Sequence, residues 1–399
     1  MTSPSLLNAI RPEARAARQS GIVELFNYGR GREGLIPLWV GEGDLPTPDF
    51  IAEAARRSFA AGETFYTAQR GLPAFREAIA AYMTRCYGGP GGNFSPEQFF
   101  VTAGGMHALQ IAIRLLAGPG DEVITPAPSW PNFEAALTIS GASTVCVPLE
   151  LGSEAGGALR WRLDPRRVAS AITPRTRAIV INSPGNPTGW TAGLPELEAL
   201  LALAREHGLW IIADEIYGRI SFEGARAPSF HDVMAPTDRI LFVQTLSKNW
   251  AMTGWRVGWL EAPPELGDII ENLIQYSTSG VATPTQRAAA AALEEGEDFL
   301  SRQMARLRAS RDVLCDALAA SGRARFARPP GSFYLFCAFD GVVDSRAAAM
   351  RIVEEANLGL APGSAFGPGG EGFMRICFAR DPVSMGEAAD RLARWLASS

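Results

Sequence analysis

Between about residues 98 and 260, apolar runs of strand length alternate with helical or turn-rich stretches. The apolar runs are EQFFVTA, DEVITPA, STVCVPL, RAIVINS, LWIIADE and RILFVQT, and the stretches between them include GGMHALQIAIRLLAG and LPELEALLALAREHG. Strands that are apolar throughout are expected to be buried on both faces, and their alternation with helices is typical of a parallel sheet. The pattern therefore predicts an α/β fold in which helices cover both faces of a mostly parallel sheet.

The pattern changes after residue 284, where a long helix rich in alanine and arginine is expected. Two strand-like pieces, SFYLFCAF and FMRICFA, and a final helix follow it. We expect these elements to form a smaller α+β domain, which the first forty or so residues join in space. A chain of 399 residues exceeds the usual limit for a single core. The predicted division is a large domain of residues 44–284 and a small domain of residues 1–43 and 285–399.

Composition and charge are those of an ordinary soluble globular protein, with 47% hydrophobic residues, 20% charged residues and a net charge of −5. The sequence has no dense basic run, so neither a nucleic acid nor an anionic membrane surface is expected as a partner. The start of the sequence lacks the apolar core of a signal peptide, and no apolar stretch is long enough to span a bilayer.

Cysteine and histidine usage narrows the chemistry. Five scattered cysteines without a CxxC pair predict reduced thiols in a cytoplasmic protein, not a disulfide framework or a zinc site. The three histidines lie outside any motif, so neither histidine-centred catalysis nor metal ligation is expected. Chemistry is therefore expected from other residue types, without a metal.

Residues capable of chemistry gather where the predicted strands end. In an open parallel sheet, ligands bind outside the carboxyl ends of the strands. A glycine pair at a strand-to-helix turn, in TAGGMHAL, can hold a phosphate on bare backbone N–H groups, and the other strand ends carry an asparagine, a carboxylate, a phenol and a lysine. These residues are Gly104 and Gly105, Asn186, Asp214 and Tyr217, and Lys248 with Thr245, Ser247 and Arg256 nearby. Together they describe a pocket for pyridoxal 5′-phosphate.

Each of these features also has an ordinary structural explanation. A glycine pair before a helix is usually only a tight turn, and Asn186 in a proline- and glycine-rich segment has a similar explanation. The DEIY segment that holds Asp214 is more often a helix start, and a single lysine at a strand end is usually a surface residue. Four such features in this order on one sheet edge favour the cofactor pocket.

Motifs along nearly the whole chain resemble those of one family. They are LWVGEGDLPTP, FYTAQRGLPAFREAIA, NSPGNPTG, DEIY, SKNWAMTGWRVGW, PGSAFG and RICFA. With them the chain is similar to the class I/II aminotransferases of the fold-type I pyridoxal-phosphate superfamily, close to the bacterial aspartate aminotransferases. The resemblance implies that residues 44–284 bind the cofactor and that the active species is a homodimer. The motifs are highly specific for the family but not for one substrate.

The resemblance assigns roles around the cofactor. Lys248 matches the lysine that forms a Schiff base with the cofactor and carries a proton to and from the substrate, which requires an amine that is partly unprotonated. Asp214 matches the carboxylate beneath the pyridine nitrogen, where its charge keeps the ring an electron sink. Tyr217 and Asn186 match the donors to the ring oxygen, and Trp130 matches the aromatic residue that stacks on the ring. The residues matched to the phosphate are Gly104, Gly105, Met106, Thr245, Ser247, Arg256 and, from the neighbouring subunit, Tyr66.

For the substrate, the resemblance points to Arg375 and Gly41, with Trp130 and Asn186 beside them. Arg375 matches the arginine that clamps the α-carboxylate, because a planar guanidinium forms two parallel hydrogen bonds to a carboxylate. Without the family match, we would favour an arginine paired with an acid on a strand of the small domain. Gly41 matches a position where the backbone closes over the substrate. The implied activity is transfer of the α-amino group of an L-amino acid to a 2-oxo acid, by a ping-pong mechanism through a Lys248 Schiff base.

Three other functions share parts of this sequence pattern. The same fold and cofactor motifs serve enzymes that eliminate at Cβ, so a pyridoxal-phosphate-dependent C–S β-lyase is the alternative function. A transcription regulator with an aminotransferase-like sensor would need a DNA-binding domain, which about forty leading residues without a basic recognition helix do not supply. A non-catalytic descendant is disfavoured because the lysine, the aspartate, the tyrosine, both arginines and the phosphate loop are all kept.

Departures from the family pattern concern the substrate end. The usual GEPDF reads GEGDL here, which places Gly43 and Leu45 near the expected active-site entrance. Before it, the segment LFNYGRGREGLIPLW adds aromatic and basic residues, and in the family this part of the chain lies near the substrate.

Two further departures bear on the substrate side chain. Met106 stands where related bacterial aspartate enzymes often have a lysine, and Gln275 where others carry an arginine. Neither residue offers a cation to a second carboxylate, so we expect neutral amino acids to serve as donors at least as well as aspartate. Arg30 or Arg32 could supply that charge, but a solvated loop charge is the favoured interpretation of both.

Overall fold

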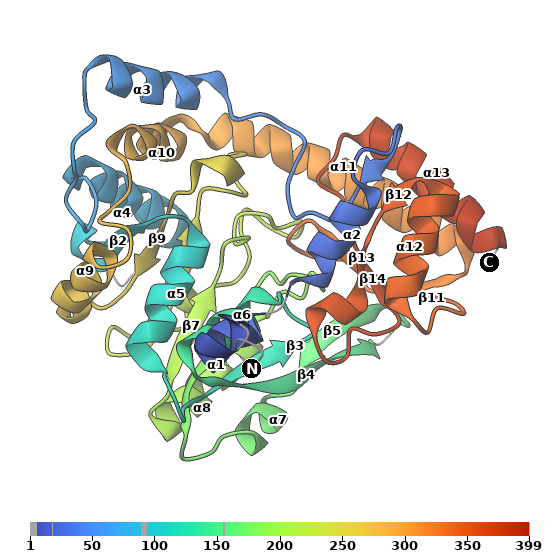
Figure 1. Ribbon diagram of the computed structural model, residues 1–399, viewed down its shortest axis with the longest axis horizontal. Coiled ribbons are helices and arrows are strands. Elements are labelled where there is room, and N and C mark those ends of the chain that lie inside the picture. The colour runs from blue at the N-terminus through green and yellow to red at the C-terminus, as the bar shows by residue number, and fades with distance from the viewer. Residues whose placement is uncertain (1–5, 18, 89–93, 155, 399) are drawn as a thin grey trace, which may run out of the picture.

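The computed structural model describes residues 6–17, 19–88, 94–154 and 156–398 and has one large sheet at its centre (Figure 1). This sheet has eight strands in the order β2-β9-β8-β7-β6-β3-β4-β5. Neighbouring strands from β8 to β4 are parallel, whereas β9 is antiparallel to both of its neighbours and β5 is antiparallel to β4. The strands are β2 (Phe99–Thr102), β3 (Glu122–Ala127), β4 (Ser143–Ser153), β5 (Leu159–Leu163), β6 (Thr176–Asn182), β7 (Trp210–Asp214), β8 (Ile240–Thr245) and β9 (Gly258–Glu261). The predicted mostly parallel sheet is confirmed, and each of the six apolar runs overlaps one of its strands.

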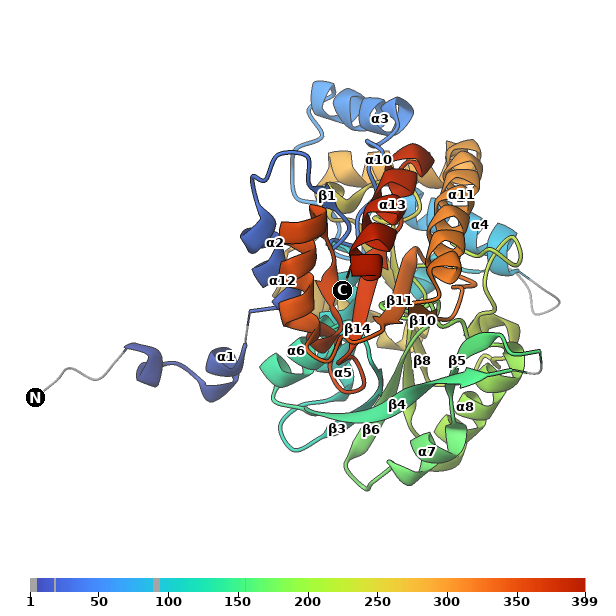
Figure 2. The same ribbon diagram turned by 90° about the vertical axis from the view of Figure 1, so that its right-hand side faces the viewer.

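Helices cover both faces of this sheet, which explains why every residue of β3 and β8 is buried. Helix α5 packs on β7, β8 and β9, α6 packs on β4, and α8 packs on β7. Figure 2 shows α5 and α6 on one side of the strands and α7 and α8 on the other. The bounds of these helices are α5 (Gly105–Leu116), α6 (Asn132–Ser140), α7 (Pro165–Ser170) and α8 (Leu194–His207).

Local signals in the sequence set where individual helices begin and end. At the start of α8, the Glu196 carboxylate accepts a 2.9 Å hydrogen bond from the backbone N–H of Gly193. Gly208 ends that helix in the left-handed conformation, with φ of 65°, which costs glycine little. The side chain of Asp344 caps the start of α12 (Ser345–Ala356), and Asn357 ends it in the left-handed conformation.

A second sheet, antiparallel and four-stranded in the order β10-β11-β14-β13, belongs to the C-terminal part of the chain. The amino-terminal segment lies against this part, because β1 pairs with β12 and α2 packs on α12 and β13; Figure 1 shows the blue segment beside the red elements. Residues 21–37 therefore lie against the C-terminal elements, whereas the preceding helix α1 (Pro12–Ala16) packs on α6, so only part of the first forty residues joins this domain. The domain boundaries given above stay a prediction. The elements are α2 (Gly21–Gly29), β1 (Ile36–Pro37), α11 (Glu297–Ser321), β10 (Ala324–Phe326), β11 (Tyr334–Phe339), β12 (Leu358–Gly359), β13 (Ala361–Pro362), β14 (Phe373–Cys377) and α13 (Pro382–Ser398).

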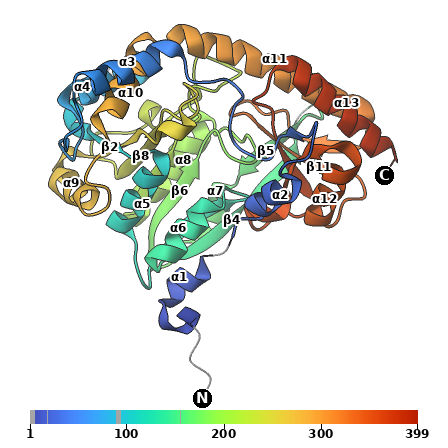
Figure 3. The ribbon, with the colours of Figure 1, turned by 45° about the horizontal axis from the view of Figure 1, so that its top comes forward.

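At the opposite end of the molecule, α10 packs on α3 and α4 over a second hydrophobic cluster. Figure 3 shows α11 running from this end to the C-terminal elements.

No helix in the described part of the chain is both long and apolar enough to cross a membrane. The remaining elements are α1 (Pro12–Ala16), α3 (Asp49–Ala60), α4 (Pro73–Tyr87), α9 (Gly267–Gln275), α10 (Thr283–Glu295) and the 3₁₀ turns Leu6–Ala9, Pro96–Gln98, Phe230–Asp232, Thr253–Trp255, Pro264–Leu266 and Gly363–Phe366.

Candidate active site

A cavity of about 450 Å³ lies at the carboxyl ends of the central parallel strands. Strands β6, β7 and β8 end there at Asn182, Asp214 and Thr245. The C-terminal sheet supplies part of the cavity wall through Tyr334 and Arg375. This is the position at which an open parallel sheet binds its ligand.

Most residues predicted for the site line this cavity. Gly104 is next to it, immediately before Gly105, and Tyr66 lies elsewhere on the molecule. The predicted residues that line the cavity are Gly41, Gly105, Met106, Trp130, Asn186, Asp214, Tyr217, Thr245, Ser247, Lys248, Arg256 and Arg375.

Lys248 is half-buried and lies at the cavity, just after β8. Its Nζ donates a hydrogen bond of 2.7 Å to the carbonyl oxygen of Gly41. Burial is the main cause that lowers the pKa of this amine to about 8; Arg375 and Arg256 act in the same direction, and Glu42 acts against it. A neutral amine, which nucleophilic attack and proton transfer both require, is therefore accessible near neutral pH.

Asp214 is the last residue of β7, and only 1% of it is exposed. Burial raises the pKa of its carboxyl to about 7, although a hydrogen bond from the backbone N–H of Ile216, 3.4 Å long, and the positive charge of Lys248 favour the carboxylate. A buried carboxylate is costly unless a cation or a hydrogen-bond donor meets it. Asp214 is therefore suited to hold a protonated ring nitrogen.

Arg375 lies in β14 and is 2% exposed. One terminal nitrogen, Nη1, donates a 3.0 Å hydrogen bond to Oδ1 of Asn186, and Nη2 donates to the carbonyl of Trp39. Its Nε has no hydrogen-bond partner in the described part of the chain. The partners of this buried cation are thus an amide and a carbonyl, which leaves its charge available to a substrate carboxylate.

The amide of Asn182 connects two of the strand ends. Its Oδ1 accepts a 2.8 Å hydrogen bond from the backbone N–H of Asn186, and its Nδ2 donates a 3.0 Å bond to the carbonyl of Asp214. Asn182 therefore holds the segment of Asn186 against the strand that carries Asp214.

The turn between β2 and α5 has the geometry of an anion site. Gly104 has φ of 80°, a conformation that favours glycine, and the helix begins at Gly105. A Cβ atom added to Gly104 would lie 2.7 Å from Nη2 of Arg256. The hydroxyls of Thr245 and Ser247, 2.9 Å apart, line the same cavity. A helix N-terminus, two hydroxyls and a guanidinium together are suited to a phosphate group.

Apolar side chains contribute to the rest of the cavity wall. Ile22 and Val23 of α2 line it together with Trp130 and Met106. The sulfur of Met106 accepts a 3.6 Å hydrogen bond from Nδ2 of Asn132. A substrate side chain on this side therefore meets mostly carbon and sulfur.

Four residues considered from the sequence lie away from the cavity. Tyr66 is 93% exposed and lines a separate pocket on the surface. Gln275, the last residue of α9, and Arg30, which follows α2, are both exposed. Nη1 of Arg32 donates a 2.8 Å hydrogen bond to the carbonyl of Val353. None of the four lines the cavity in the described structure.

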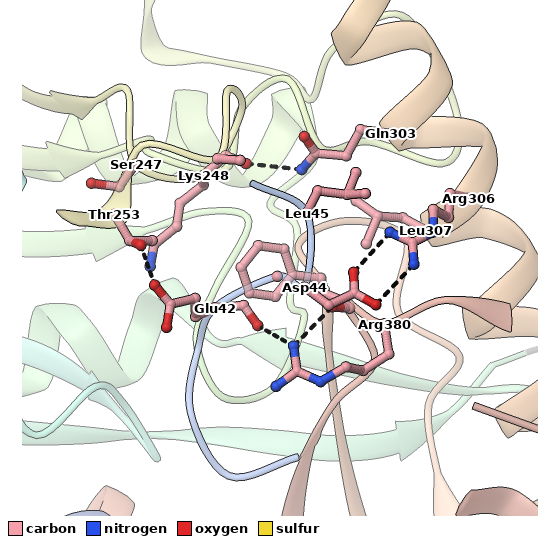
Figure 4. A pocket seen from close by; sticks show the side chains of 14 residues that line it. Glu42, Asp44, Leu45, Ser247, Lys248, Thr253, Gln303, Arg306, Leu307 and Arg380 are labelled. Atoms are coloured by element: carbon pink, nitrogen blue, oxygen red, sulfur yellow. Dashed lines mark hydrogen bonds and ion pairs between the residues drawn. The ribbon is translucent and has the colours of Figure 1, made fainter. Parts of the chain in front are cut away.

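Behind Lys248 lies a second, smaller cavity, shown in Figure 4. The carboxylate of Asp44 forms hydrogen bonds of 2.7 and 2.8 Å with Arg306 of α11, which ties the GEGDL segment to that helix. Gly43 and Leu45, where this segment departs from the family pattern, both line the smaller cavity. The anchored segment includes the carbonyl that accepts the hydrogen bond from Lys248.

Motif reading alone missed several contributors to the site. Asn182 is the polar residue that ends the apolar run RAIVI, and Tyr334 lies at the start of the strand-like piece SFYLFCAF, so each had a signal in position. For Lys248, which the motifs did identify, composition gives a second and simpler signal. It is the only lysine among the 37 lysine and arginine residues of the chain. Ile22 and Val23 had no such signal, since only the packing of α2 brings them to the cavity.

The cavity residues fit pyridoxal 5′-phosphate. The Gly104 turn and Arg256 form a cradle for the phosphate that a side chain on Gly104 would fill. The buried carboxylate of Asp214 suits the ring nitrogen, and the amine of Lys248 suits an aldehyde. These residues, all at one cavity, are therefore suited to the phosphate, the ring nitrogen and the aldehyde of that cofactor.

Comparisons with known proteins agree with this chemistry. The family model described as aminotransferase class I and II matches residues 33–392. An aspartate/prephenate aminotransferase of Thermus thermophilus is 34% identical over 98% of this chain and 97% of its own, and an arginine–pyruvate transaminase of Pseudomonas aeruginosa is 36% identical over 90% of each. The solved structure of an aspartate aminotransferase of Thermotoga maritima is similar with a TM-score of 0.89 at 31% identity, covering 97% of this chain and 100% of that one. Each of these three proteins is a transaminase, and none is a C–S lyase.

Proposed function

This chain belongs to the class I and II aminotransferases and is a pyridoxal-phosphate-dependent transaminase, and on that premise we propose that its amino donors are L-amino acids with uncharged side chains. The observation that carries the proposal is the charge of the cavity wall. The cationic side chains that line the cavity, in the described residues, are Lys248, Arg256 and Arg375. Each has a place in the chemistry common to all substrates, so none remains for a second carboxylate.

The cofactor would be held by the residues that form the anion cradle and by the buried carboxylate. Arg256 and the N-terminus of α5 would bind the phosphate, and Asp214 would hold the ring nitrogen protonated. When bound, pyridoxal 5′-phosphate supplies an aldehyde carbon that takes up amines and a ring that withdraws electrons from the substrate α-carbon. Tyr217, Asn186 and Trp130 would fix the orientation of that ring.

The amine of Lys248 would move the proton. Its lowered pKa gives it a neutral form that can take a proton from the substrate α-carbon and return one on the same side. The hydrogen bond from Nζ to the Gly41 carbonyl keeps the amine at the cavity wall when it is not bonded elsewhere.

Arg375 would bind the α-carboxylate that all amino acid and 2-oxo acid substrates share. Its guanidinium is buried, and its Nε is without a hydrogen-bond partner among the described residues. Two parallel hydrogen bonds from a guanidinium fix a carboxylate in one plane, and thereby direct the amino group toward Lys248.

The side-chain end of the substrate would meet Ile22, Val23 and Met106. Placing a second carboxylate there without a cation is costly, whereas an apolar group gains free energy from burial. The names of the relatives cover aspartate, aromatic amino acids and arginine, so the family by itself does not select among these substrates.

Half-reactions test the donor class directly. Single amino acids are added to the purified enzyme without an acceptor, and the loss of the cofactor's visible band is followed. Specificity constants for alanine, methionine and phenylalanine are expected to equal or exceed the constant for aspartate. A large preference for aspartate would contradict the proposal.

A substitution sharpens this test. Met106→Lys is expected to raise the specificity constant for aspartate relative to methionine by about tenfold or more, because it adds a cation worth ~1.4 kcal/mol or more to a second carboxylate. Met106→Leu, which keeps the wall apolar, is the matched control and should leave the ratio near that of the wild type. If Met106→Lys leaves the ratio as close to that of the wild type as Met106→Leu does, residue 106 does not face the substrate side chain.

We also propose a cytoplasmic homodimer in which Tyr66 reaches the phosphate of the neighbouring subunit. Tyr66 is 93% exposed in the isolated chain, and Phe65, next to it in the sequence, is 85% exposed. Tyr276, two residues before the segment 278–282 that lines the same surface pocket as Tyr66, is 84% exposed. Exposed aromatic residues gathered on one surface are typical of a protein interface. The cytoplasmic location rests on the cysteines, none of which forms a disulfide in the described chain.

A further inference from the structure

Tyr334, which no motif singles out, lies at the centre of the cavity wall. It is the first residue of β11, and only 1% of it is exposed. Its Oη lies 2.8 Å from Oη of Tyr217, within hydrogen-bond distance. The two rings meet edge to face, with centroids 5.6 Å apart.

The hydrogen-bond direction follows from the neighbouring charge. Each phenol has one proton, so one hydroxyl donates to the other. The guanidinium carbon of Arg375 lies 4.6 Å from the centroid of the Tyr334 ring, and its positive charge opposes the rise that burial causes in the pKa of Tyr334. Burial raises the pKa of Tyr217 well above its ordinary value, and the charge of Asp214 raises it further. Arg375 lowers the pKa of both phenols, but it is the main opposing influence on Tyr334 and only a minor one on Tyr217. Tyr334 is therefore the better donor, and Tyr217 the acceptor.

Packing leaves the Tyr334 hydroxyl in one place. A Cβ atom added to Gly41 would collide with this oxygen, so the hydroxyl lies directly against the backbone of Gly41. The ring of Phe333 lies on another side, with centroids 4.8 Å apart. In β11, Tyr334 is paired with Cys377 of β14, which holds its backbone in the sheet. The phenol is thus held between Gly41, Tyr217 and Arg375.

Once Tyr217 accepts this hydrogen bond, its own proton is directed elsewhere. In the described part of the chain, Tyr334 is the residue with which the Tyr217 hydroxyl forms a hydrogen bond. Tyr217 also lines the cavity. A hydroxyl that accepts from a fixed donor is oriented and becomes a stronger donor itself.

We infer that Tyr334 is a positioning residue, which donates its proton to Tyr217 so that the Tyr217 hydroxyl donates into the cavity, toward the ring oxygen of the cofactor. The inference rests on the proposed role of Tyr217. Tyr334 lines the cavity, and in this role it acts through Tyr217 and is held by the same arginine that would bind the substrate carboxylate.

A spectroscopic titration tests the inference. The visible band of the cofactor-loaded enzyme changes with pH as a proton beside the ring oxygen is lost. A weaker donor at that oxygen leaves more negative charge on it, which holds the proton more tightly. Tyr334→Phe is therefore expected to raise the midpoint by about 0.5–1 pH unit, the range that loss of part of one hydrogen bond implies.

A double-variant cycle separates this role from a merely structural one. In the Tyr217→Phe background, Tyr334→Phe should produce no further shift, because its effect passes through the Tyr217 hydroxyl. Tyr82→Phe, which removes another buried phenol hydroxyl in the second hydrophobic cluster, is the matched control and should leave the midpoint unchanged. An unchanged midpoint in Tyr334→Phe, or a shift that persists without the Tyr217 hydroxyl, would overturn the inference.

A second variant keeps the test independent of folding defects. Replacing Tyr334 with 3,5-difluorotyrosine keeps the ring and makes the phenol a better donor, so the midpoint should fall below that of the wild type. A midpoint that rises or stays unchanged contradicts the inference. Failure of the proposed function gives a different result, since a wild-type enzyme that takes up no cofactor shows no visible band to titrate.

Discussion

At the scale of single residues, the site depends on one amine whose charge the fold controls. Lys248 is the only lysine in the chain, and the other 36 of its 37 lysine and arginine residues are arginines, which stay charged at any pH of interest. Burial lowers the pKa of Lys248 to about 8, from an ordinary value near 10.5. The chain therefore has one side-chain amine that can be neutral near physiological pH.

This pKa predicts a pH dependence for cofactor capture by the cofactor-free enzyme. Below about pH 8 Lys248 is mostly an ammonium ion, which does not attack an aldehyde, and above it the amine is mostly neutral. The rate of capture should therefore rise about tenfold per pH unit between pH 6 and 7, and level off above about pH 8. Stopped-flow absorbance after mixing with pyridoxal 5′-phosphate measures this rate.

Two outcomes would contradict the assignment of Lys248. One is a capture rate that does not change between pH 6 and 8. The other is a Lys248→Ala variant that takes up as much borohydride-stable cofactor as the wild type. Because the chain has no second lysine, intact-mass measurement of this uptake decides the matter without peptide mapping.

At the scale of elements, the turn from β2 into α5 connects backbone geometry to ligand binding. Gly104 has φ of 80°, which places the first N–H groups of α5 at the cavity. The missing side chain is equally necessary, since a Cβ atom would lie 2.7 Å from the Arg256 guanidinium. The turn therefore requires glycine both for its conformation and for the space that the arginine occupies.

Gly104→Ala is expected to weaken cofactor binding by about 10- to 100-fold, because backbone strain of ~1–3 kcal/mol is added and Arg256 is displaced. The matched control is Gly120→Ala, where φ is 90° and nothing lies within 4 Å of an added Cβ atom. Both variants introduce strain, but only Gly104→Ala should change the dissociation constant of the cofactor, measured by fluorescence titration. Equal weakening in both would show that strain alone, and not the collision with Arg256, is responsible.

At the scale of the whole molecule, the phosphate cradle and an exposed aromatic surface belong to different regions of one chain. The cradle is in the cavity, whereas Tyr66 lines a surface pocket with residues 278–282 and does not contact that cavity. A tyrosine side chain that is 93% exposed contributes little packing free energy in a monomer. In a two-fold symmetric homodimer, Tyr66 of each subunit would reach the phosphate site of the other, so the two sites would be equivalent.

Sedimentation velocity of the cofactor-loaded enzyme should therefore show a dimer that carries the activity. Tyr66→Phe should keep the dimer but weaken cofactor binding by about 10-fold, since one hydrogen bond to a charged phosphate is worth ~1.5–3 kcal/mol at most. Tyr276→Phe removes a hydroxyl from a similarly exposed tyrosine and should leave cofactor binding unchanged. A fully active monomer would refute the assembly.

Much of this organisation was determined by the sequence itself. Six apolar runs predicted strands of the central sheet, because a strand buried on both faces must be apolar at every position. Their polar ends placed Asp214 and Lys248 at one sheet edge, since parallel strands share the edge at which they end. The motifs added the family, because they specify a combination of turn, strand end and catalytic residue that is local in the chain.

Only the tertiary structure decided the contacts that join distant segments. Arg375 meets Asn186 across 189 positions, and Tyr217 meets Tyr334 across 117, and no local pattern encodes which of these side chains meet. The pKa of Lys248 depends on burial by segments from both ends of the chain, so composition could not set it. The apolar wall at Ile22 likewise follows from how α2 packs, because hydrophobic periodicity specifies a face of a helix but not what that face meets.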